Sequence, residues 1–391
     1  TITEYVLRHC ARLGDKAALI DGPSGRTLSY RQLADAIRRA AAGLAARGFK
    51  KGDVLAIYSP NLPEYGVAML AAATLGGVTT TANPLYTADE LAKQLQDSRA
   101  KLLLIVPPFL DKAKEAAQKV GIQDVYVFGA AEGARPFAEL LQAGDLPPTV
   151  AIDPAQDLVV LPYSSGTTGL PKGVMLTHRN LVANLCQAEA MEKFDGFSER
   201  DVIMAFLPFF HIYGMVVIMM FGLAGGGTIV SMPRFDLVEF LTLVQKYRAT
   251  ILPLVPPVVL GMVKHPAVAQ FDLSSVRLVF SGAAPLGEDI ARELSKKLGC
   301  PVVQGYGMTE ASPVTHLSPT HDAPMKPGSV GRVVPATEVK IVDVVTLEEV
   351  AQGTEGELWI RGPQIMKGYL GHPEETAACL DREGWYHTGD V

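Results

Sequence analysis

Apolar and polar residues along the first half of the chain follow two patterns, one typical of helices and one typical of short buried strands. A helical period covers residues 28–48, where Ser29 is placed to cap the helix and Gly48 to end it. Further helices are predicted over 64–78 and 110–121. Short apolar runs predict strands beside them, over residues 53–59, 102–106 and 124–128. Strands that alternate with helices of this length indicate βαβ units and parallel sheets.

The pattern changes in the last quarter of the chain. Apolar runs over 277–282 and 302–307 still predict strands that end in glycines. After Pro313 the helical period is absent, and we expect Gly, Pro and alternating strands, such as 338–343 and 356–362, up to Val391. This predicts a smaller antiparallel β element appended to an α/β body.

A long uncharged segment lies between Asp201 and Arg234. A membrane-spanning helix needs roughly 20 apolar residues, but Pro208 and His211 interrupt the start of this segment, and three glycines at 225–227 break its end. Proline and glycine at such spacings are typical of the short elements of soluble proteins. We therefore predict a buried helix over 213–223 and a strand over 228–233, and the first ten residues lack the pattern of a signal peptide.

Composition supports a large folded core. The chain has 391 residues, of which 48% are hydrophobic, so we expect one multilobed unit or two to three domains. Its net charge of −6, with both signs interspersed, argues against nucleic acid or an anionic membrane as the main partner. The four cysteines match no metal-ligand spacing, so we expect reduced thiols in a cytoplasmic protein; they are Cys10, Cys186, Cys300 and Cys379.

The stretch YSSGTTGLPKG, residues 163–173, joins two strongly apolar strands. Glycines allow a backbone to approach an anion closely, Ser and Thr hydroxyls add hydrogen-bond donors, and Lys172 adds a mobile positive charge. The stretch does not match G-x-x-x-x-G-K-[ST], and GYGMTE further along lacks the third glycine of a dinucleotide fingerprint. By itself it is compatible with a phosphate-binding loop or with a flexible surface loop.

Four further stretches change the interpretation. They are FFHIYG (209–214), SGAAPLG (281–287), QGYGMTE (304–310) and YHTGD (386–390). Together with 163–173, and in this order, they resemble the motifs of the adenylate-forming enzymes, which include acyl- and aryl-CoA ligases, firefly luciferase and peptide-synthetase adenylation domains. The chain is most similar to 4-coumarate–CoA ligases and medium-chain acyl-CoA ligases within that superfamily.

The resemblance implies a layered αβαβα fold, with two stacked, mostly parallel sheets flanked by helices and a small, distorted antiparallel β-barrel. It implies that residues 1–391 are an N-terminal adenylation domain with three approximate subdomains: a first α/β sheet (55–195), a second (1–54 with 196–314) and the barrel (315–391). In this family a mobile C-terminal lid follows, and the sequence stops before it. We expect such a fragment to bind ATP but to be a weak catalyst, because the lid supplies a lysine and excludes water.

The implied substrates are ATP with Mg²⁺, a carboxylic acid and coenzyme A. Glu310 would ligate Mg²⁺, Thr309 would contact the α-phosphate, and Asp390 would accept hydrogen bonds from the ribose hydroxyls. Adenine would lie against Tyr306 and the backbone of Gly282, Ala283, Gln304 and Gly305. The β- and γ-phosphates would be held by Ser164, Ser165, Gly166, Thr167, Thr168, Gly169 and Lys172. Without the resemblance, we would interpret the Thr-Glu pair as a helix start and Asp390 as part of an exposed turn.

The same resemblance places the acid beside His211, a histidine that could donate to its carboxylate, and Arg234 near a coenzyme A phosphate. By itself, His211 is typical of a core histidine and Arg234 of a solvated arginine. The acid pocket would be lined by Tyr213, Val217, Phe280, Ala283, Gly305, Pro313 and Val314. Plant coumarate ligases commonly have a lysine where Phe280 stands, so we expect an apolar pocket for an aryl or medium-chain acid without exclusive preference for hydroxycinnamates.

Two other functions remain open from the sequence. One is an adenylating enzyme with a different acceptor, such as a carrier-protein thiol or oxygen. The other is a non-catalytic nucleotide-binding scaffold, which the presence of His211, Thr309, Glu310 and Asp390 argues against.

Overall fold

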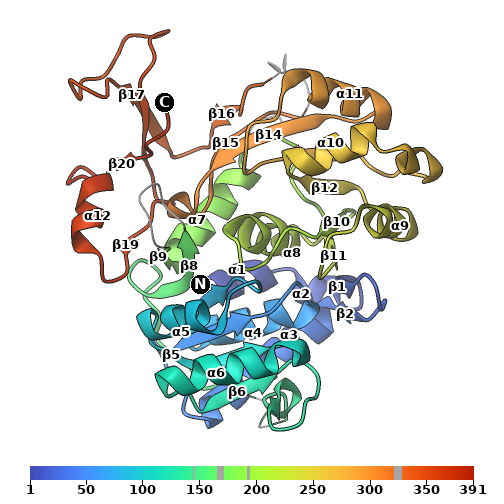
Figure 1. The fold of residues 1–391 in the computed structure, drawn as a ribbon, viewed down its shortest axis with the longest axis vertical. Coiled ribbons are helices and arrows are strands. Elements are labelled where there is room, and N and C mark those ends of the chain that lie inside the picture. Colours follow the sequence, from blue (N-terminus) through green and yellow to red (C-terminus); the bar gives the residue numbers. More distant parts are fainter. Residues whose placement is uncertain (143, 145, 165–170, 192–193, 321–327) are drawn as a thin grey trace.

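The computed structural model describes residues 1–142, 144, 146–164, 171–191, 194–320 and 328–391. Within these residues the fold is α/β, with two large parallel-dominated sheets, helices on both sides of them and a small antiparallel sheet (Figure 1). No helix in the described part of the chain has the length and apolar composition that a membrane crossing requires.

The larger sheet has nine strands, of which the central six are parallel and the edge strands β2, β15 and β16 are antiparallel to their neighbours. In spatial order they are β16 (Arg332–Val333), β15 (Val314–Leu317), β14 (Val302–Gly307), β13 (Leu278–Ser281), β12 (Ile251–Leu254), β10 (Val202–Ala205), β11 (Thr228–Ser231), β1 (Ala17–Asp21) and β2 (Thr27–Ser29).

The second sheet has eight strands and is parallel from β8 to β7, while β9 and β19 form an antiparallel edge. In spatial order they are β19 (Gly368–Tyr369), β9 (Lys172–Thr177), β8 (Leu158–Ser164), β4 (Val78–Ala82), β3 (Val54–Tyr58), β5 (Ala100–Ile105), β6 (Asp124–Val127) and β7 (Arg135–Pro136). The strands predicted over 53–59, 102–106 and 124–128 are β3, β5 and β6.

Helices form three layers around the two sheets. α1 contacts α4, α7 and α8, and this group lies between the sheets, whereas α5 and α6 cover one outer face and α9 to α11 lie on the opposite side of the molecule (Figure 1). The α-helices are α1 (Ile2–Leu7), α2 (Cys10–Leu13), α3 (Tyr30–Ala46), α4 (Pro63–Thr74), α5 (Ala88–Asp97), α6 (Leu110–Val120), α7 (His178–Glu189), α8 (Phe221–Ala224), α9 (Leu237–Tyr247), α10 (Pro256–Lys264), α11 (Glu288–Leu298) and α12 (Pro373–Cys379). Shorter 3₁₀ turns are η1 (Pro107–Phe109), η2 (Phe137–Glu139), η4 (Pro266–Gln270) and η5 (Thr309–Ala311).

The helix predicted over 28–48 shows why local sequence specifies these elements. Ser29 accepts a hydrogen bond from the backbone N–H of Gln32, and the Gln32 side chain accepts one from the N–H of Ser29, so α3 begins with a capping box. The buried helix predicted over 213–223 is also present. It is a π-helix, η3 (Tyr213–Met220), that continues into α8, and β11 follows where a strand was predicted.

The end of the chain differs in part from the sequence prediction. An antiparallel sheet of three strands is present, β17 (Glu338–Val342), β18 (Glu357–Arg361) and β20 (Tyr386–His387), while β15, β16 and β19 extend the two large sheets. The expectation that no helix follows Pro313 is wrong, because α12 is there. None of its residues is buried, so it has no apolar period to detect. The subdomain boundaries stay a prediction.

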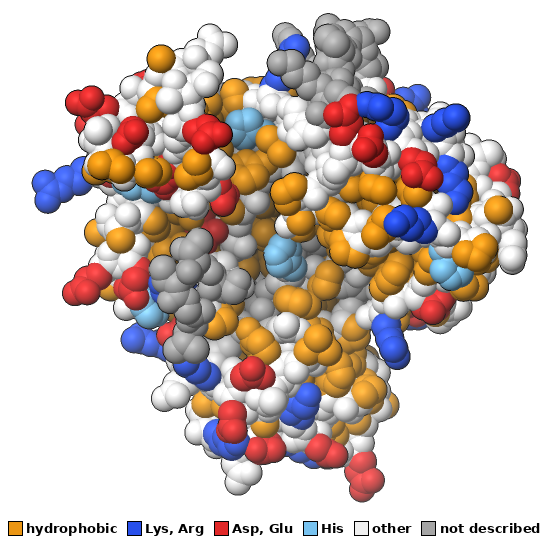
Figure 2. Space-filling view, turned by 45° about the horizontal axis from the view of Figure 1, so that its top comes forward, with side chains coloured by type: hydrophobic (Ala, Val, Ile, Leu, Met, Phe, Trp, Pro, Cys, Tyr) orange, Lys and Arg blue, Asp and Glu red, His pale blue; other side chains and the backbone are white. Residues whose placement is uncertain are grey.

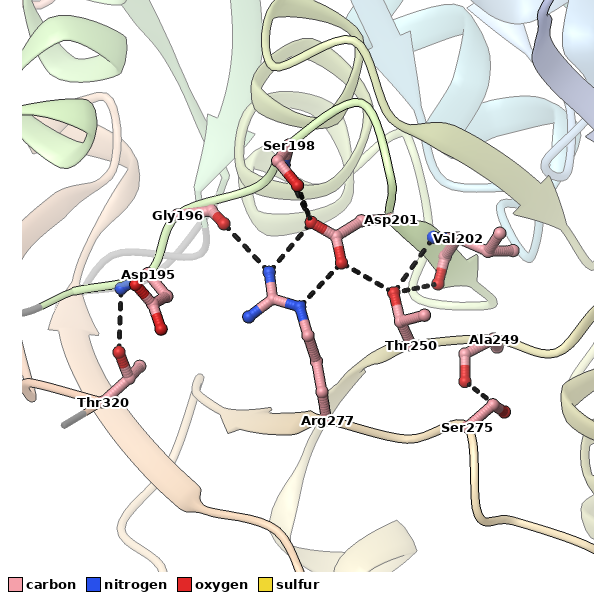
Figure 3. Close-up of polar contacts among 10 residues, drawn as sticks. All are labelled: Asp195, Gly196, Ser198, Asp201, Val202, Ala249, Thr250, Ser275, Arg277 and Thr320. Carbon is pink, nitrogen blue, oxygen red and sulfur yellow. Dashed lines mark hydrogen bonds and ion pairs between the residues drawn. The ribbon is translucent and has the colours of Figure 1, made fainter.

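A buried ion pair fixes the amino ends of the central strands of the larger sheet (Figure 3). Asp201, which precedes β10, is fully buried and accepts hydrogen bonds from Arg277 Nε at 2.7 Å and Nη2 at 2.8 Å. Thr250, before β12, donates to the same carboxylate at 2.8 Å. Burial alone would raise the pKa of Asp201, but these hydrogen bonds and that from Ser198 outweigh it and lower the pKa to about 2. These contacts therefore align three neighbouring strands, of which β13 contributes Phe280 to the cavity described next.

Candidate active site

A cavity of about 840 Å³ opens at the carboxyl ends of parallel strands from both large sheets. β8 contributes Ser164, β13 contributes Phe280 and β14 contributes Gly305 to Gly307, while Thr81 comes from β4. Figure 2 shows hydrophobic side chains gathered around a hollow in the middle of this face. The carboxyl edge of a parallel sheet is where open α/β folds bind ligands, so this cavity is the candidate active site.

Most of the site residues predicted from the sequence line this one cavity. They are Ser164, Lys172, His211, Tyr213, Val217, Phe280, Gly282, Ala283, Gly305, Tyr306, Thr309, Glu310, Pro313, Val314 and Asp390. Residues 164 and 172, 305–310 and 390, which together span more than 200 positions of the sequence, thus meet at a shared space.

The remaining predicted residues lie elsewhere or outside the described residues. Ser165, Gly166, Thr167, Thr168 and Gly169 fall in 165–170, which is outside them. Gln304 is buried beside the cavity and its amide pairs with the backbone of Leu286, accepting from N at 2.9 Å and donating to O at 3.2 Å. Arg234 is exposed after β11 and is not part of the cavity lining.

Glu310 is a buried carboxylate in the polar wall. It lies on η5, directly after β14, and is 6% exposed. Its Oε1 accepts hydrogen bonds from the Ser164 and Tyr369 hydroxyls, both at 2.9 Å. No described residue donates a hydrogen bond to Oε2. Two elements far apart in the chain, β8 and β19, therefore hold one oxygen of this carboxylate in place.

Lys172 begins β9 on the same wall. Its Nζ lies 5.4 Å from the centre of the Tyr369 ring and 4.0 Å from Glu375 Oε1 of α12. Ammonium over an aromatic face at this distance is attracted to the ring. An anion that enters the cavity beside Lys172 would therefore meet a cation already oriented by two neighbours.

Tyr306 and Asp390 form the other polar contact across the cavity. The Tyr306 hydroxyl donates a hydrogen bond to Asp390 Oδ2. The Asp390 backbone N–H donates to Thr388 Oγ1 at 3.0 Å, and the Gly389 N–H donates to Glu357 Oε1 at 2.7 Å. Burial and the neighbouring carboxylate raise the pKa of Tyr306, so the phenol stays protonated and remains a donor.

The apolar wall is built on the π-helix η3 and on β13. Val217 comes from η3, and its neighbour Tyr213 donates a hydrogen bond to the carbonyl oxygen of Phe280 at 3.0 Å and packs edge-on against the Phe280 ring. A methyl group added at Gly305 would lie 2.7 Å from Phe280 Cζ. Glycine at 305 thus leaves room for the aromatic ring that defines this wall. π-helices are rare and often occur at functional sites.

His211 lies where the loop after β10 enters η3. Its Nδ1 accepts a hydrogen bond from the Tyr213 backbone N–H at 3.2 Å, and the surrounding protein lowers the pKa of the imidazole. At neutral pH the ring is therefore uncharged, with its proton on Nε2. That N–H is available as a hydrogen-bond donor on the cavity lining.

The donor set suits a magnesium nucleotide better than a metal held by protein alone. In the described ranges, no three His, Cys, Asp or Glu side chains gather closely enough to hold a metal ion. Mg²⁺ is usually bound by one or two carboxylates, with substrate phosphates and water completing its octahedron. Glu310, buried and with Oε2 unoccupied by the described donors, fits this mode.

Sequence reasoning missed several polar residues of the lining. Tyr369 and Glu375 belong to a two-residue strand and a seven-residue helix, elements too short for a periodic signal. His387 and Thr388 lie inside the YHTGD stretch, where only Asp390 was singled out. The residues of the lining that had no predicted role include Thr81, Asn83, Tyr86, Tyr163, Glu357, Tyr369, Glu375, Cys379, Tyr386, His387 and Thr388.

Comparison with known proteins agrees with this geometry. The 4-coumarate–CoA ligase 2 of Petroselinum crispum is 44% identical over 402 residues, and 4-coumarate–CoA ligase 5 of Oryza sativa subsp. japonica is 46% identical over 394 residues. Each alignment covers 99% of this chain and 72% of the relative.

Solved structures share the fold. The anthranilate CoA ligase AuaEII, in complex with anthranoyl-AMP, superposes with a TM-score of 0.91 at 22% identity and covers 99% of this chain and 73% of its own. ATP-bound MatB from Rhodopseudomonas palustris has a TM-score of 0.87 at 31% identity, covering 98% of this chain and 75% of its own. Residues 6–370 match the family described as AMP-binding enzyme. The chain therefore belongs to the AMP-binding enzymes, the adenylate-forming family that its five motifs resemble.

Proposed function

We propose that this protein is an acid–CoA ligase, which uses ATP to activate an apolar carboxylic acid and then transfers the acyl group to coenzyme A. The observation that supports it most is the single cavity in which Glu310, Ser164 and Lys172 face the same space as Tyr306 and Asp390 and as the apolar wall around Phe280. The 4-coumarate–CoA ligases at 44% and 46% identity support the same reaction class.

In the first half-reaction a carboxylate oxygen of the acid attacks the α-phosphorus of ATP. The bond between the α-phosphorus and the bridging oxygen breaks, and pyrophosphate leaves with the electron pair. Lys172 and Ser164 hold the outer phosphates, and Thr309 lies beside Glu310 to contact the α-phosphate. Catalysis of this kind depends on positioning and on charge stabilisation. Magnesium, held by Glu310, would neutralise phosphate charge.

The nucleoside and the acid occupy the remaining walls. Asp390 accepts from the ribose hydroxyls, and adenine lies against Tyr306 near Gly282, Ala283 and Gly305. The acid lies along Tyr213, Val217, Phe280, Pro313 and Val314. The His211 Nε2–H donates a hydrogen bond to the carboxylate of the acid. Because the imidazole is neutral, it does not form an ion pair with that carboxylate.

In the second half-reaction the thiol of coenzyme A loses its proton to solvent as its sulfur attacks the acyl carbon, and AMP leaves with the electron pair of the acyl–oxygen bond. Arg234, exposed and outside the cavity, is the residue that we assign to a coenzyme A phosphate. Arg234→Ala should raise the KM for coenzyme A at least five-fold and leave acid-dependent pyrophosphate exchange unchanged. A matching loss of exchange would contradict this assignment.

The direct test of the proposed function is acid-dependent exchange of labelled pyrophosphate into ATP. A panel of cinnamate, 4-coumarate and linear C6–C16 acids should contain acids that support exchange, and Glu310→Gln should reduce the rate by about 10²–10³. Release of AMP that requires coenzyme A would identify the acceptor, whereas equal release without it would favour another acceptor. ATP binding with no exchange for any acid in the panel, measured with the C-terminal lid expected from the family present, would overturn the proposal in favour of a nucleotide-binding scaffold.

A further inference from the structure

Tyr369 lies between the two charged residues of the polar wall, although no motif of the sequence singled it out. It belongs to β19, which pairs with β9 so that Tyr369 is opposite Val174. The Leu370 N–H donates to the Gly173 carbonyl at 2.9 Å, and the Tyr369 N–H donates to Thr376 Oγ1 at 2.9 Å. The backbone of Tyr369 is thus fixed directly beside the strand that begins at Lys172.

The two ends of the Tyr369 side chain have different partners. Its hydroxyl donates to Glu310 Oε1 at 2.9 Å, and its ring lies 5.4 Å from Lys172 Nζ. The side chain is half-buried. The ring alone cannot replace the hydroxyl as a hydrogen-bond donor to Glu310.

The Tyr369 hydroxyl helps to fix the orientation of the Glu310 carboxylate. Ser164 of β8 and Tyr369 of β19 both donate to Oε1, and no described residue donates to Oε2. Two donors on one oxygen fix the carboxylate plane and leave the other oxygen for a cation. Groups that hold a metal ligand in this way typically contribute 10- to 100-fold to metal affinity or activity.

We propose that Tyr369 is a positioning residue of the nucleotide site, which holds Glu310 through its hydroxyl for a divalent cation and Lys172 through its ring for phosphate. This inference rests on the proposed function, because it requires that the cavity take a magnesium nucleotide. The hydroxyl and the ring of Tyr369 thus have separate roles, and a different substitution tests each role.

Tyr369→Phe tests the hydroxyl. The readout is thermal stabilisation of the protein by ATP, measured over a series of MgCl₂ concentrations without acid or coenzyme A. We expect the Mg²⁺ concentration for half-maximal stabilisation to rise about ten-fold, with little change in the stabilisation by ATP in EDTA. Tyr369→Leu also removes the ring and should in addition weaken the stabilisation by ATP in EDTA, because Lys172 loses its aromatic neighbour.

Two controls separate positioning from a general structural effect. Tyr247→Phe removes a half-buried tyrosine hydroxyl that donates to the Gly22 carbonyl at 3.1 Å, outside the cavity lining, and should leave the Mg²⁺ midpoint unchanged. The second control is the double variant Glu310→Gln/Tyr369→Phe. If the hydroxyl acts through Glu310, adding Tyr369→Phe to Glu310→Gln should change the Mg²⁺ response less than two-fold.

The outcomes are distinguishable. An unchanged Mg²⁺ midpoint in Tyr369→Phe, or a full ten-fold effect that persists in the Glu310→Gln background, overturns the role of Tyr369 while leaving the proposed function intact. Failure of the wild-type protein to respond to ATP with MgCl₂ overturns the proposed function itself. If Tyr369→Phe is less stable without ligand, its Mg²⁺ midpoint remains comparable with that of the other proteins, because each protein is measured relative to its own ligand-free melting temperature.

Discussion

Tyr306 and Asp390, 84 residues apart in the sequence, are joined by a hydrogen bond from the tyrosine hydroxyl to the aspartate Oδ2. The contact connects the end of β14 in the larger sheet to the segment after β20 in the small antiparallel sheet. Asp390 is itself exposed, and its segment is fixed by Thr388 and Glu357. The carboxylate is therefore oriented toward the cavity before any ligand enters.

This contact predicts a graded loss of nucleotide affinity. Asp390→Ala removes the acceptor for the ribose hydroxyls and should weaken ATP binding about 10- to 100-fold, because hydrogen bonds to charged groups contribute about 1.5–3 kcal/mol. Tyr306→Phe keeps the ring and removes only the hydroxyl that orients Asp390, so we expect a two- to five-fold loss. Calorimetric titration with ATP measures both. A dissociation constant for Asp390→Ala within two-fold of wild type would contradict the assignment of Asp390 to the nucleoside.

The ion pair between Asp201 and Arg277 should dominate the stability of the larger sheet. Arg277→Met leaves the fully buried Asp201 carboxylate without its bidentate partner, which typically costs 3–5 kcal/mol. Arg248→Met is the matched control, because Arg248 and Asp272 form an exposed pair at 3.4 Å, and such pairs contribute about 0–1 kcal/mol. Urea unfolding at pH 7 measures the free energy of both variants. Equal losses for the two would show that burial of Asp201 does not determine the energy of its pair.

The elements that the sequence predicted well are those whose signal is local. α3 begins at Ser29 because a capping box needs only Ser29 and Gln32, and strands such as β3 and β5 have the apolar residues that a doubly covered parallel sheet requires. The placement of η3 was also predictable, since it is apolar on every side. The π-helical geometry of η3 could not be predicted. A helix that is buried on all sides has no hydrophobic period from which the number of residues per turn can be inferred.

The site could be predicted only where a motif carries its residue. Ser164, Glu310 and Asp390 were found because their stretches resemble a family, while Tyr369 and Glu375 were missed. β19 is two residues long and pairs with a strand almost 200 positions earlier, so its role comes from long-range pairing and not from local pattern. The contact between Lys172 and Glu375 depends in the same way on where α12 packs.

The apolar side chain of Phe280 predicts a preference between cinnamate and 4-coumarate as the acid substrate. A 4-hydroxyl group on a cinnamate ring finds no hydrogen-bonding partner in a phenyl side chain, and the Tyr213 hydroxyl already donates to the Phe280 carbonyl oxygen. Burial of an unpaired hydroxyl costs about 1–3 kcal/mol. We therefore expect kcat/KM for 4-coumarate to be at least five-fold below that for cinnamate in the exchange assay. Phe280→Lys should narrow or reverse this ratio, and a wild-type preference for 4-coumarate would show that the hydroxyl has a partner elsewhere in the wall.

His316 predicts how stability depends on pH. It lies on β15 with its ring 5.8 Å from the Tyr306 ring and its Nδ1 3.0 Å from Thr315 Oγ1, and burial lowers its pKa to about 4. In the unfolded chain the imidazole has a pKa near its ordinary value of about 6.5. Between these two values the unfolded state binds a proton that the folded state does not, so stability decreases as pH falls from 6.5 to 4 and the loss from this residue is complete below pH 4.

His316→Gln is the variant that isolates this contribution, because glutamine keeps a polar side chain and does not titrate. The wild-type protein should lose about 1–3 kcal/mol more than the variant between pH 7 and pH 4.5. His178, whose pKa burial also lowers to about 4, contributes to both proteins alike and cancels in the difference. Urea unfolding at pH 7, 6, 5 and 4.5 measures the two curves. Parallel curves would mean that His316 is protonated as readily in the folded protein as in the unfolded chain, and that β15 accommodates the charge beside Tyr306.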